Sequence, residues 1–214
     1  CPHWNLKLKK GTVLPVICYT NCEDAELFVN GRSFGMKSKG FPCYGMTERY
    51  GHFDRYRRPA NTDDLFLSWD VPYEPGKIEV VGYHDGKEVC RYNVETTGEA
   101  AAIKLTVDKT SVDADGRSVV QAEVRILDSE GHLVFDACPE LNFTLEGDGE
   151  IIGIDNGDPA CHEQWKETKG RHAFNGMAYA VIRAGQNKGE LTLTVQASGV
   201  DAAIGKASVT ISQK

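Results

Sequence analysis

The sequence predicts an all-β protein built from two antiparallel β-sandwich domains in series. First, apolar and polar residues alternate along many short segments, which is the two-residue period of strands that bury one face. Second, Asn-Gly, Asp-Gly and related turn pairs separate these segments at short intervals. Third, the 214 residues are enough for two domains that each bury a core. Helical patterns are scarce, so we expect strands to form both cores.

Two hairpins are predicted in the first half of the chain. The stretch "AELFVNGRSFG" alternates apolar residues and then supplies Asn30-Gly31, a pair that tolerates the positive φ of a tight hairpin turn. The stretch "KIEVVGYHDGKEVCRYNVET" repeats this pattern around Asp85-Gly86. Two consecutive hairpins predict an antiparallel sheet, and Trp69, in the middle of an apolar segment, is predicted to lie in its core. Trp4, beside His3, is instead expected to contact another domain.

A run of small residues, "TTGEAAA" at positions 96–102, predicts a linker with the domain boundary near Gly98. The predicted domains are therefore residues 1–98 and 99–214. About seven strands are expected in the second domain, at spacings typical of a sandwich. Their segments are "AIKLTVD", "VVQAEVRILD", "HLVF", "LNFTLEG", "MAYAVIRAG", "ELTLTVQASG" and "KASVTIS".

Composition and charge exclude several classes of function. A net charge of -7 would repel a phosphate backbone, so nucleic acid is not expected as a partner. No apolar run approaches the roughly 20 residues of a membrane helix, so no membrane insertion is expected. Seven scattered cysteines without a CxxC pair make neither a disulfide framework nor a zinc motif, and we predict no metal and no cofactor. The start "CPHWN" lacks a signal-peptide pattern, and we expect it to be the edge of a fragment of a longer chain.

The common catalytic scaffolds and motifs are also missing from the pattern. The sequence does not show the eight strand and helix units of a TIM barrel, a glycine-rich phosphate loop, an HExxH motif or a GxSxG motif. We therefore predict no catalytic residue in this chain.

The stretch "DNGDPACHEQWKETKGRHAFNG", residues 155–176, interrupts the strand pattern. Its first residues predict a turn, but the rest has no strand or helix period, and a loop of this length is uncommon unless it serves a function. An aromatic ring among convergent polar groups is typical of a site for a polar ligand. The alternative is that Trp165 and Phe174 close one end of the sandwich while Arg171 pairs with Asp155 or Asp158. The candidate ligand-binding residues, for a sugar or at the rim of an active site, are Asp155, Asn156, Asp158, His162, Glu163, Trp165 and Arg171.

Several stretches carry a resemblance to a known family. "YTNCEDAELFVNGRSFG" and "LSWDVPYEPGKIEVVGYHDGKEV" resemble the domain of unknown function that follows the catalytic barrel in bacterial β-galactosidases of glycoside hydrolase family 2. "AAIKLTVDKTSVDADGRSVVQAEVRILDSEGHLV", "GIDNGDP" and "AFNGMAYAVIRAG" are similar to the Ig-like C-terminal domain of the same enzymes, which is related to invasin-type repeats. Together these matches cover nearly the whole chain.

The resemblance implies two tandem Ig-like β-sandwich domains at the C-terminal end of a Bacteroides-type β-galactosidase. It implies the catalytic barrel of the same parent chain as partner and a periplasmic or cell-surface location. Retaining hydrolysis needs two carboxylates about 5 to 5.5 Å apart, and in this family both lie on the barrel. The resemblance therefore implies a non-catalytic accessory region. The alternatives are a carbohydrate-binding module and, third, a fragment of a cell-surface Ig-like adhesin.

An insertion departs from the family pattern between the first hairpin and the next strand. Residues 36–64 are rich in arginine and aromatic residues, which favour both protein interfaces and sugar contacts. We expect either packing against the barrel or a contact with a carbohydrate. The residues concerned are Phe41, Tyr44, Tyr50, Phe53, Tyr56, Arg49, Arg55, Arg57 and Arg58.

Overall fold

The computed structural model describes residues 3–38, 66–164, 166 and 169–214. The chain divides into two compact units, Cys1–Thr96 and Thr97–Lys214. Both units consist of antiparallel β-sheets, and the second also contains one short parallel strand pairing. The only helical element in the described part of the chain is a 3-10 helix, η1 (Gly199–Ile204). The predicted all-β fold is confirmed. No helix among these residues has the length and apolar character needed to span a bilayer.

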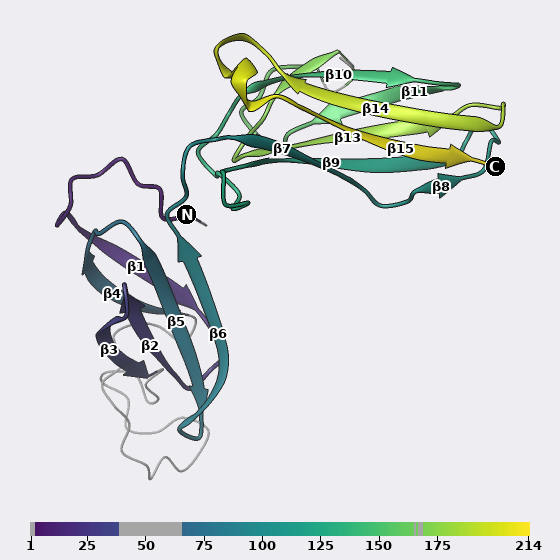
Figure 1. Ribbon diagram of the computed structural model, residues 1–214. Coiled ribbons are helices and arrows are strands. Elements are labelled where there is room, and N and C mark those ends of the chain that lie inside the picture. Colours follow the sequence, from purple (N-terminus) through teal and green to yellow (C-terminus); the bar gives the residue numbers. More distant parts are fainter. Residues whose placement is uncertain (1–2, 39–65, 165, 167–168) are drawn as a thin grey trace. The chain divides into compact units, whose positions relative to one another are not determined.

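The first unit contains two sheets (Figure 1). A four-stranded sheet has the order β3-β2-β5-β6, and a two-stranded sheet pairs β1 with β4. Buried side chains from both sheets form one core, so the unit is a small sandwich. The strands are β1 (Val13–Tyr19), β2 (Asp24–Val29), β3 (Arg32–Ser38), β4 (Phe66–Pro72), β5 (Lys77–His84) and β6 (Lys87–Glu95).

Both predicted hairpins are present in this unit. The β2–β3 turn places Asn30 and Gly31 at φ 50° and 79°, and the β5–β6 turn places Asp85 and Gly86 at 48° and 73°. Two successive positive φ values are what a type I′ turn requires, and its twist matches that of the strands it joins. Local turn chemistry therefore sets the register of the four-stranded sheet.

The two described tryptophans of this unit both lie in its core. Trp69 is buried in β4 and donates a hydrogen bond from Nε1 to the carbonyl oxygen of Gly35 at 2.9 Å, as expected for a core residue. The expectation that Trp4 contacts another domain is wrong. Trp4 is 5% exposed, packs edge-on against Tyr73 and donates from Nε1 to the carbonyl oxygen of Glu74 at 2.8 Å. The segment before β1 thus closes the core of its own unit.

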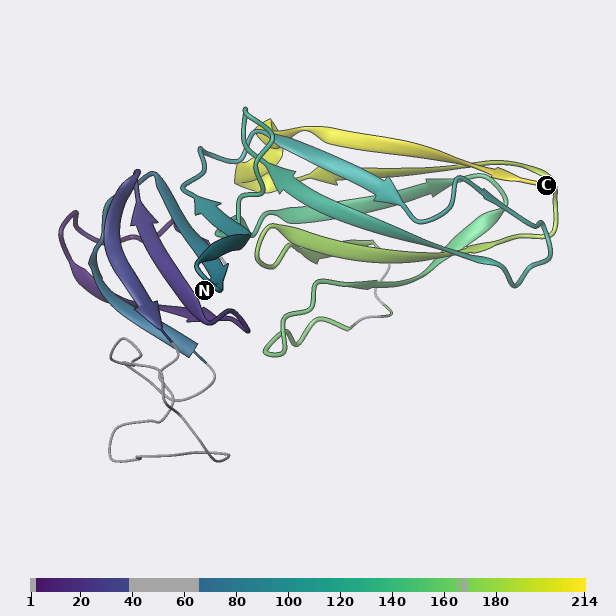
Figure 2. The same cartoon turned by 90° about the horizontal axis from the view of Figure 1, so that it is seen from below.

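The second unit is a larger sandwich, with one sheet in the order β12-β10-β14-β15-β8 and another in the order β11-β13-β9-β7 (Figures 1 and 2). Its core draws alternate residues from both sheets, including Val124, Ile182 and Leu193. The strands are β7 (Ala102–Val107), β8 (Ser111–Val112), β9 (Val119–Leu127), β10 (Glu140–Glu146), β11 (Gly149–Asp155), β12 (Gly170–His172), β13 (Met177–Ala184), β14 (Gly189–Ala197) and β15 (Lys206–Gln213).

The strand pattern of this unit differs from the prediction in several places, and the short strands β8 and β12 were not predicted. The segment "HLVF" forms no strand, and Leu133 makes only an isolated bridge to Leu127. Conversely, β11 was not predicted, because a register shift between Ile151 and Gly153 breaks the two-residue alternation along it. This shift lies directly before the loop that carries the candidate ligand-binding residues.

The start of the second unit is held by a buried carboxylate. Asp128 is buried and accepts hydrogen bonds from the backbone N–H groups of Gly98 at 2.9 Å, Glu130 at 3.0 Å and His132 at 2.8 Å. These bonds, led by that from Gly98, lower the pKa of Asp128. The small residues of the predicted linker are therefore ordered where they enter this unit.

Candidate functional site

The candidate loop, residues 156–169, joins the two sheets of the second unit. It leaves β11 in one sheet and enters β12 in the other. Strand β12 is three residues long and pairs with β10, so that Leu141 lies opposite Arg171. The loop therefore crosses from one sheet to the other, and most of its described residues are exposed.

The first residues of the loop form a chain of side-chain to backbone hydrogen bonds. Asp155 Oδ1 accepts from the backbone N–H groups of Asn156 at 2.6 Å and Gly157 at 3.1 Å. Asn156 Oδ1 accepts from the Asp158 N–H at 3.0 Å, and Asp158 Oδ1 accepts from the Ala160 N–H at 2.9 Å. These are successive Asx turns, and the left-handed φ of 74° at Gly157 fits between them. The predicted turn is present.

Arg171, on β12, is a buried charged group beside the loop. Its side chain is 2% exposed, and its guanidinium donates to the carbonyl oxygens of Ile154 at 2.8 Å, Gln164 at 2.8 Å and Glu163 at 3.1 Å. Its Nε has no hydrogen bond with a described residue and lies 3.7 Å from Glu163 Oε2. The guanidinium is internally paired, as one alternative predicted, but with Glu163 and three carbonyls instead of Asp155 or Asp158.

The carboxylate of Glu163 contacts two further polar side chains, those of His172 and Cys161. Its Oε1 lies 2.9 Å from His172 Nδ1, and its Oε2 accepts from the Cys161 thiol at 3.5 Å. The hydrogen bond with His172 is the main cause that lowers the pKa of Glu163. Sequence reasoning missed His172 and Cys161. His172 is the exposed neighbour of buried Arg171 on β12, a position that the two-residue strand period would indicate once β12 is known.

Most of the predicted site residues lie close together, but their polar atoms form hydrogen bonds with other residues of the loop. Asn156 Nδ2 donates to the His172 carbonyl at 2.9 Å, which ties the turn to β12. His162 is exposed, and Trp165 lies outside the described residues. The pKa of Asp155 is lowered, first by the Gly157 and Asn156 N–H groups and then by Arg171. Carboxylates that stay ionised in this way are poorly suited to act as a general acid.

No metal centre can be built from the described part of the chain, because no three His, Cys, Asp or Glu side chains within it lie close enough to share an ion. The arginine-rich and aromatic insertion at 36–64 lies almost wholly outside the described residues, so its predicted contacts stay predictions.

A shallow apolar groove lies beside the loop on the outer face of β11 and β13. Ile152, Gly153, Val181 and Tyr179 line it, and Asp155 stands at its polar end. Tyr179 is exposed and donates a hydrogen bond to Gln121. An aromatic ring held at its hydroxyl, beside an apolar floor, can contact the C–H face of a sugar.

A second surface stands out in the first unit. We define the β1–β4 outer face by the outward residues of its two-stranded sheet. In β1 every outward position is apolar, and Val13, Ile17 and Tyr19 are 65%, 49% and 76% exposed. The members of this face are Val13, Pro15, Ile17 and Tyr19 of β1 and Phe66, Ser68, Asp70 and Pro72 of β4.

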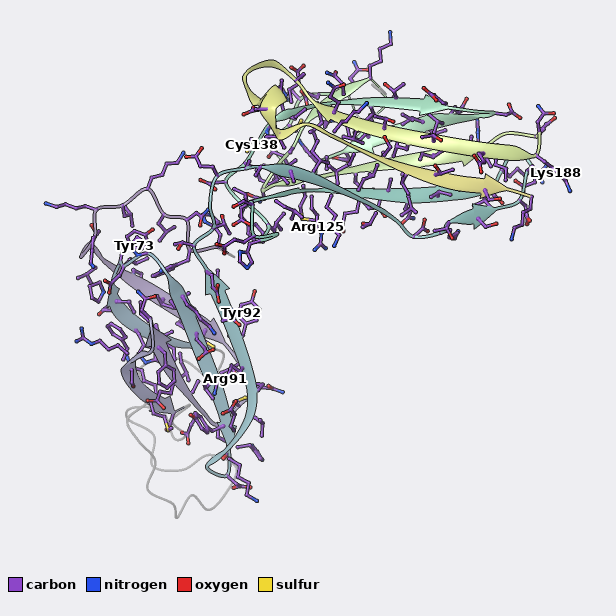
Figure 3. All side chains as sticks on the ribbon, viewed as in Figure 1. Tyr73, Arg91, Tyr92, Arg125, Cys138 and Lys188 are labelled. Carbon is purple, nitrogen blue, oxygen red and sulfur yellow. The ribbon has the colours of Figure 1, made fainter. Side chains whose placement is uncertain are left out.

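The other sheet of the first unit has a different outer face. Figure 3 shows Arg91 and Tyr92 projecting from β6. Arg91 forms ion pairs with Glu79 at 2.7 Å and Glu88 at 3.0 Å, and the same strand also exposes the apolar side chains of Val89 and Tyr92. The β1–β4 outer face differs in that every outward position of β1 is apolar.

These features define a class of protein: tandem β-sandwich modules, one with a polar loop held by internal hydrogen bonds and one with an exposed apolar strand. Comparison with known proteins gives the family. Residues 103–205 match glycoside hydrolase family 2 C-terminal domain 5, and residues 11–90 match a domain of unknown function, DUF4982. The second half of the chain thus matches a C-terminal domain of glycoside hydrolase family 2, and the resemblance found in the sequence is confirmed.

Individual relatives agree with this assignment. β-Galactosidase BoGH2A of Bacteroides ovatus is 35% identical over 97% of this chain and 22% of its own length. A putative β-glucuronidase of Formosa agariphila is 29% identical over 86% of this chain and 16% of its own length. The crystal structure of a family 2 member from Bacteroides cellulosilyticus superposes with a TM-score of 0.84 at 30% identity, over 100% of this chain and 24% of that one. The chain thus spans about a fifth of the length of each of these two curated relatives.

Proposed function

We propose that this chain is a non-catalytic C-terminal accessory region of a family 2 β-galactosidase that docks on the catalytic barrel of its parent chain. The match over residues 103–205 is to a C-terminal domain of family 2 by its description, and a β-galactosidase is similar over 97% of the chain. Docking would stabilise the barrel and shape access of substrate to it. A periplasmic or cell-surface location is part of the same proposal.

The observation that carries the proposal is the apolar character of β1. Its sequence, "VLPVICY", has no charged residue, and such a continuous apolar run is typical of a strand covered on both faces. The inward residues contact the core of the first unit, whereas the outward residues are exposed. A row of exposed apolar side chains along one strand is typical of a surface for protein contact. The part of the parent chain missing here supplies the partner.

The proposal is tested by supplying that partner. The catalytic part of the parent chain is produced separately and titrated with this chain in a calorimeter. We expect a complex with a negative heat-capacity change, because apolar surface is buried. Ile17→Lys should abolish binding at micromolar concentrations, whereas Val89→Lys, a control on the exposed edge strand β6, should leave it unchanged. Equal binding by both variants would contradict docking through the β1–β4 outer face.

The non-catalytic part of the proposal has its own test. The purified chain is incubated with a nitrophenyl β-galactoside, and we expect no hydrolysis above the buffer rate. Turnover that survives repurification would contradict it.

Carbohydrate binding is the second candidate function, and the groove beside Tyr179 is the observation that favours it. Here the chain would target the enzyme to a glycan. Calorimetric titration with galactosides and with plant and host glycans tests this, using Tyr179→Ala and Trp165→Ala as variants. Binding that is lost in either variant would support a carbohydrate-binding module, and silence with every glycan would remove it.

A further inference from the structure

We infer that Cys22 and Cys90 form an intramolecular disulfide when the protein meets an external disulfide oxidant. Their sulfur atoms lie 3.5 Å apart, although the two residues are 68 positions apart in the sequence. A disulfide requires about 2.05 Å between sulfurs, so the two atoms need to approach by roughly 1.5 Å. The pair joins the bend before β2 to the edge strand β6 and spans the intervening strand β5.

Gly82 creates the space in which the two sulfurs meet. It lies in β5, where it pairs with Ala25 of β2 on one side and Cys90 of β6 on the other. A Cβ atom at Gly82 would lie 2.6 Å from Cys22 Sγ and 2.7 Å from Cys90 Sγ. The sulfurs therefore occupy the position that any other side chain would take. The absence of a side chain on the middle strand is what allows a contact between strands that are not neighbours.

The two thiols differ in access to solvent. Cys22 is buried, and the hydroxyl oxygen of Thr20 accepts from its backbone N–H at 3.0 Å, which holds the bend in place. Cys90 is exposed on an edge strand, where an oxidant can reach it. The hydrogen bond with Cys22 raises the pKa of Cys90, so its thiolate is scarce at neutral pH and the first step is slow.

The chemistry balances in two exchange steps. The Cys90 thiolate attacks one sulfur of the external disulfide, which forms a mixed disulfide and releases one thiol. The Cys22 thiolate then attacks Cys90 Sγ and releases the second thiol. The protein loses two protons and two electrons, and the oxidant is reduced to two thiols. Cys22 acts as the resolving residue because it already lies in contact with Cys90 Sγ.

The test uses the full chain and glutathione disulfide. After equilibration at pH 8 the protein is alkylated, digested without reduction and mapped by mass spectrometry. We expect a peptide that links Cys22 to Cys90 and a mass 2 Da below that of the reduced chain. A chain in which the other cysteines are replaced by serine should give the same linked peptide. Recovery of Cys90 only as a glutathione adduct, or linked to another cysteine, would overturn the inference.

Thermal melting gives a second readout. A bridge closing a loop of this length should raise the melting temperature of the first unit by about 10 °C. Cys22→Ser should lose this redox-dependent shift, and Cys138→Ser, an exposed cysteine of the second unit (Figure 3), should keep it. Gly82→Ala should block the bridge even if it folds with lower stability, because its methyl group separates the sulfurs. A bridge that forms equally in Gly82→Ala would contradict the proposed geometry.

Discussion

Arg171 donates a hydrogen bond from Nη2 to the carbonyl oxygen of Ile154 at 2.8 Å and so fastens β12 to the end of β11. This contact decides how the candidate loop is interpreted. A guanidinium that is buried and directed at three backbone carbonyls supports the fold of the loop, and its donors are not directed at a ligand. Hydrogen bonds within the loop and to the neighbouring strands involve most of the prominent polar residues of the stretch.

Replacing Arg171 should therefore destabilise the second unit. Arg171→Met removes charge-assisted hydrogen bonds and leaves buried carbonyl groups without donors, at a cost of about 3 kcal/mol. Urea denaturation followed by circular dichroism measures this loss. Arg125→Met is the control, since Arg125 is exposed and pairs only with Glu123 on the surface, and it should change stability by less than about 0.5 kcal/mol. Equal effects of the two variants would show that burial of Arg171 is unimportant.

The pair of Glu163 and His172 predicts a pH dependence of loop stability. The pKa of Glu163 is lowered in the folded state, mainly by the hydrogen bond with His172. The stability that ionised Glu163 contributes to the fold is therefore fully present above pH 4.5, its ordinary pKa, and is lost as the pH falls through the lowered pKa. Glu163→Gln should be less stable than the wild type at pH 6, by under about 1 kcal/mol because the pair is exposed.

The difference should shrink as the pH falls from 6 to 3 through the lowered pKa of Glu163, because the wild-type carboxyl takes up a proton as well. Denaturation at both pH values checks this sign. Glu150→Gln, which breaks an exposed pair with Arg183, serves as the control. A penalty for Glu163→Gln that grows toward low pH would contradict the argument.

Trp4 should be essential to the first unit. Because its ring is buried against Tyr73, Trp4→Ala should cost about 3 to 5 kcal/mol, whereas Trp4→Phe should recover much of the loss. Tyr92→Ala, which removes an exposed ring from the same unit, should cost less than about 0.5 kcal/mol. Differential scanning calorimetry of the three variants would show this order, and a neutral Trp4→Ala would mean that the segment before β1 does not close the core.

Local signals made much of the fold predictable. The turns at Asn30-Gly31 and Asp85-Gly86 can be recognised in the sequence, because these residues accept positive φ. The alternation of apolar and polar residues in β9 and β13 matches the alternation of buried and exposed positions along these strands. Strand β11 escaped detection because its bulge puts Ile151 and Ile152 side by side and breaks the alternation. Strand β12 escaped because it is short and depends on pairing with β10, which is distant in sequence.

The composition of the candidate site and the internal pairing of Arg171 were predictable, but the partners of Arg171 were not. The Asx turns from Asp155 to Asp158 follow from residue types alone. That Arg171 would be buried could not be read from the sequence, since an arginine in a polar stretch is usually exposed. The burial of Trp4 was equally hidden, because its partners Tyr73 and Glu74 lie in a segment far along the chain.

The most direct test of the account uses the complete parent protein and measures how fast the galactosidase activity proposed for it is lost on heating. If the β1–β4 outer face docks on the barrel, Ile17→Lys should lower the temperature of half-inactivation by several degrees, and Val89→Lys should leave it unchanged. Identical inactivation of the wild type and both variants would contradict the proposal that this region supports the catalytic domain.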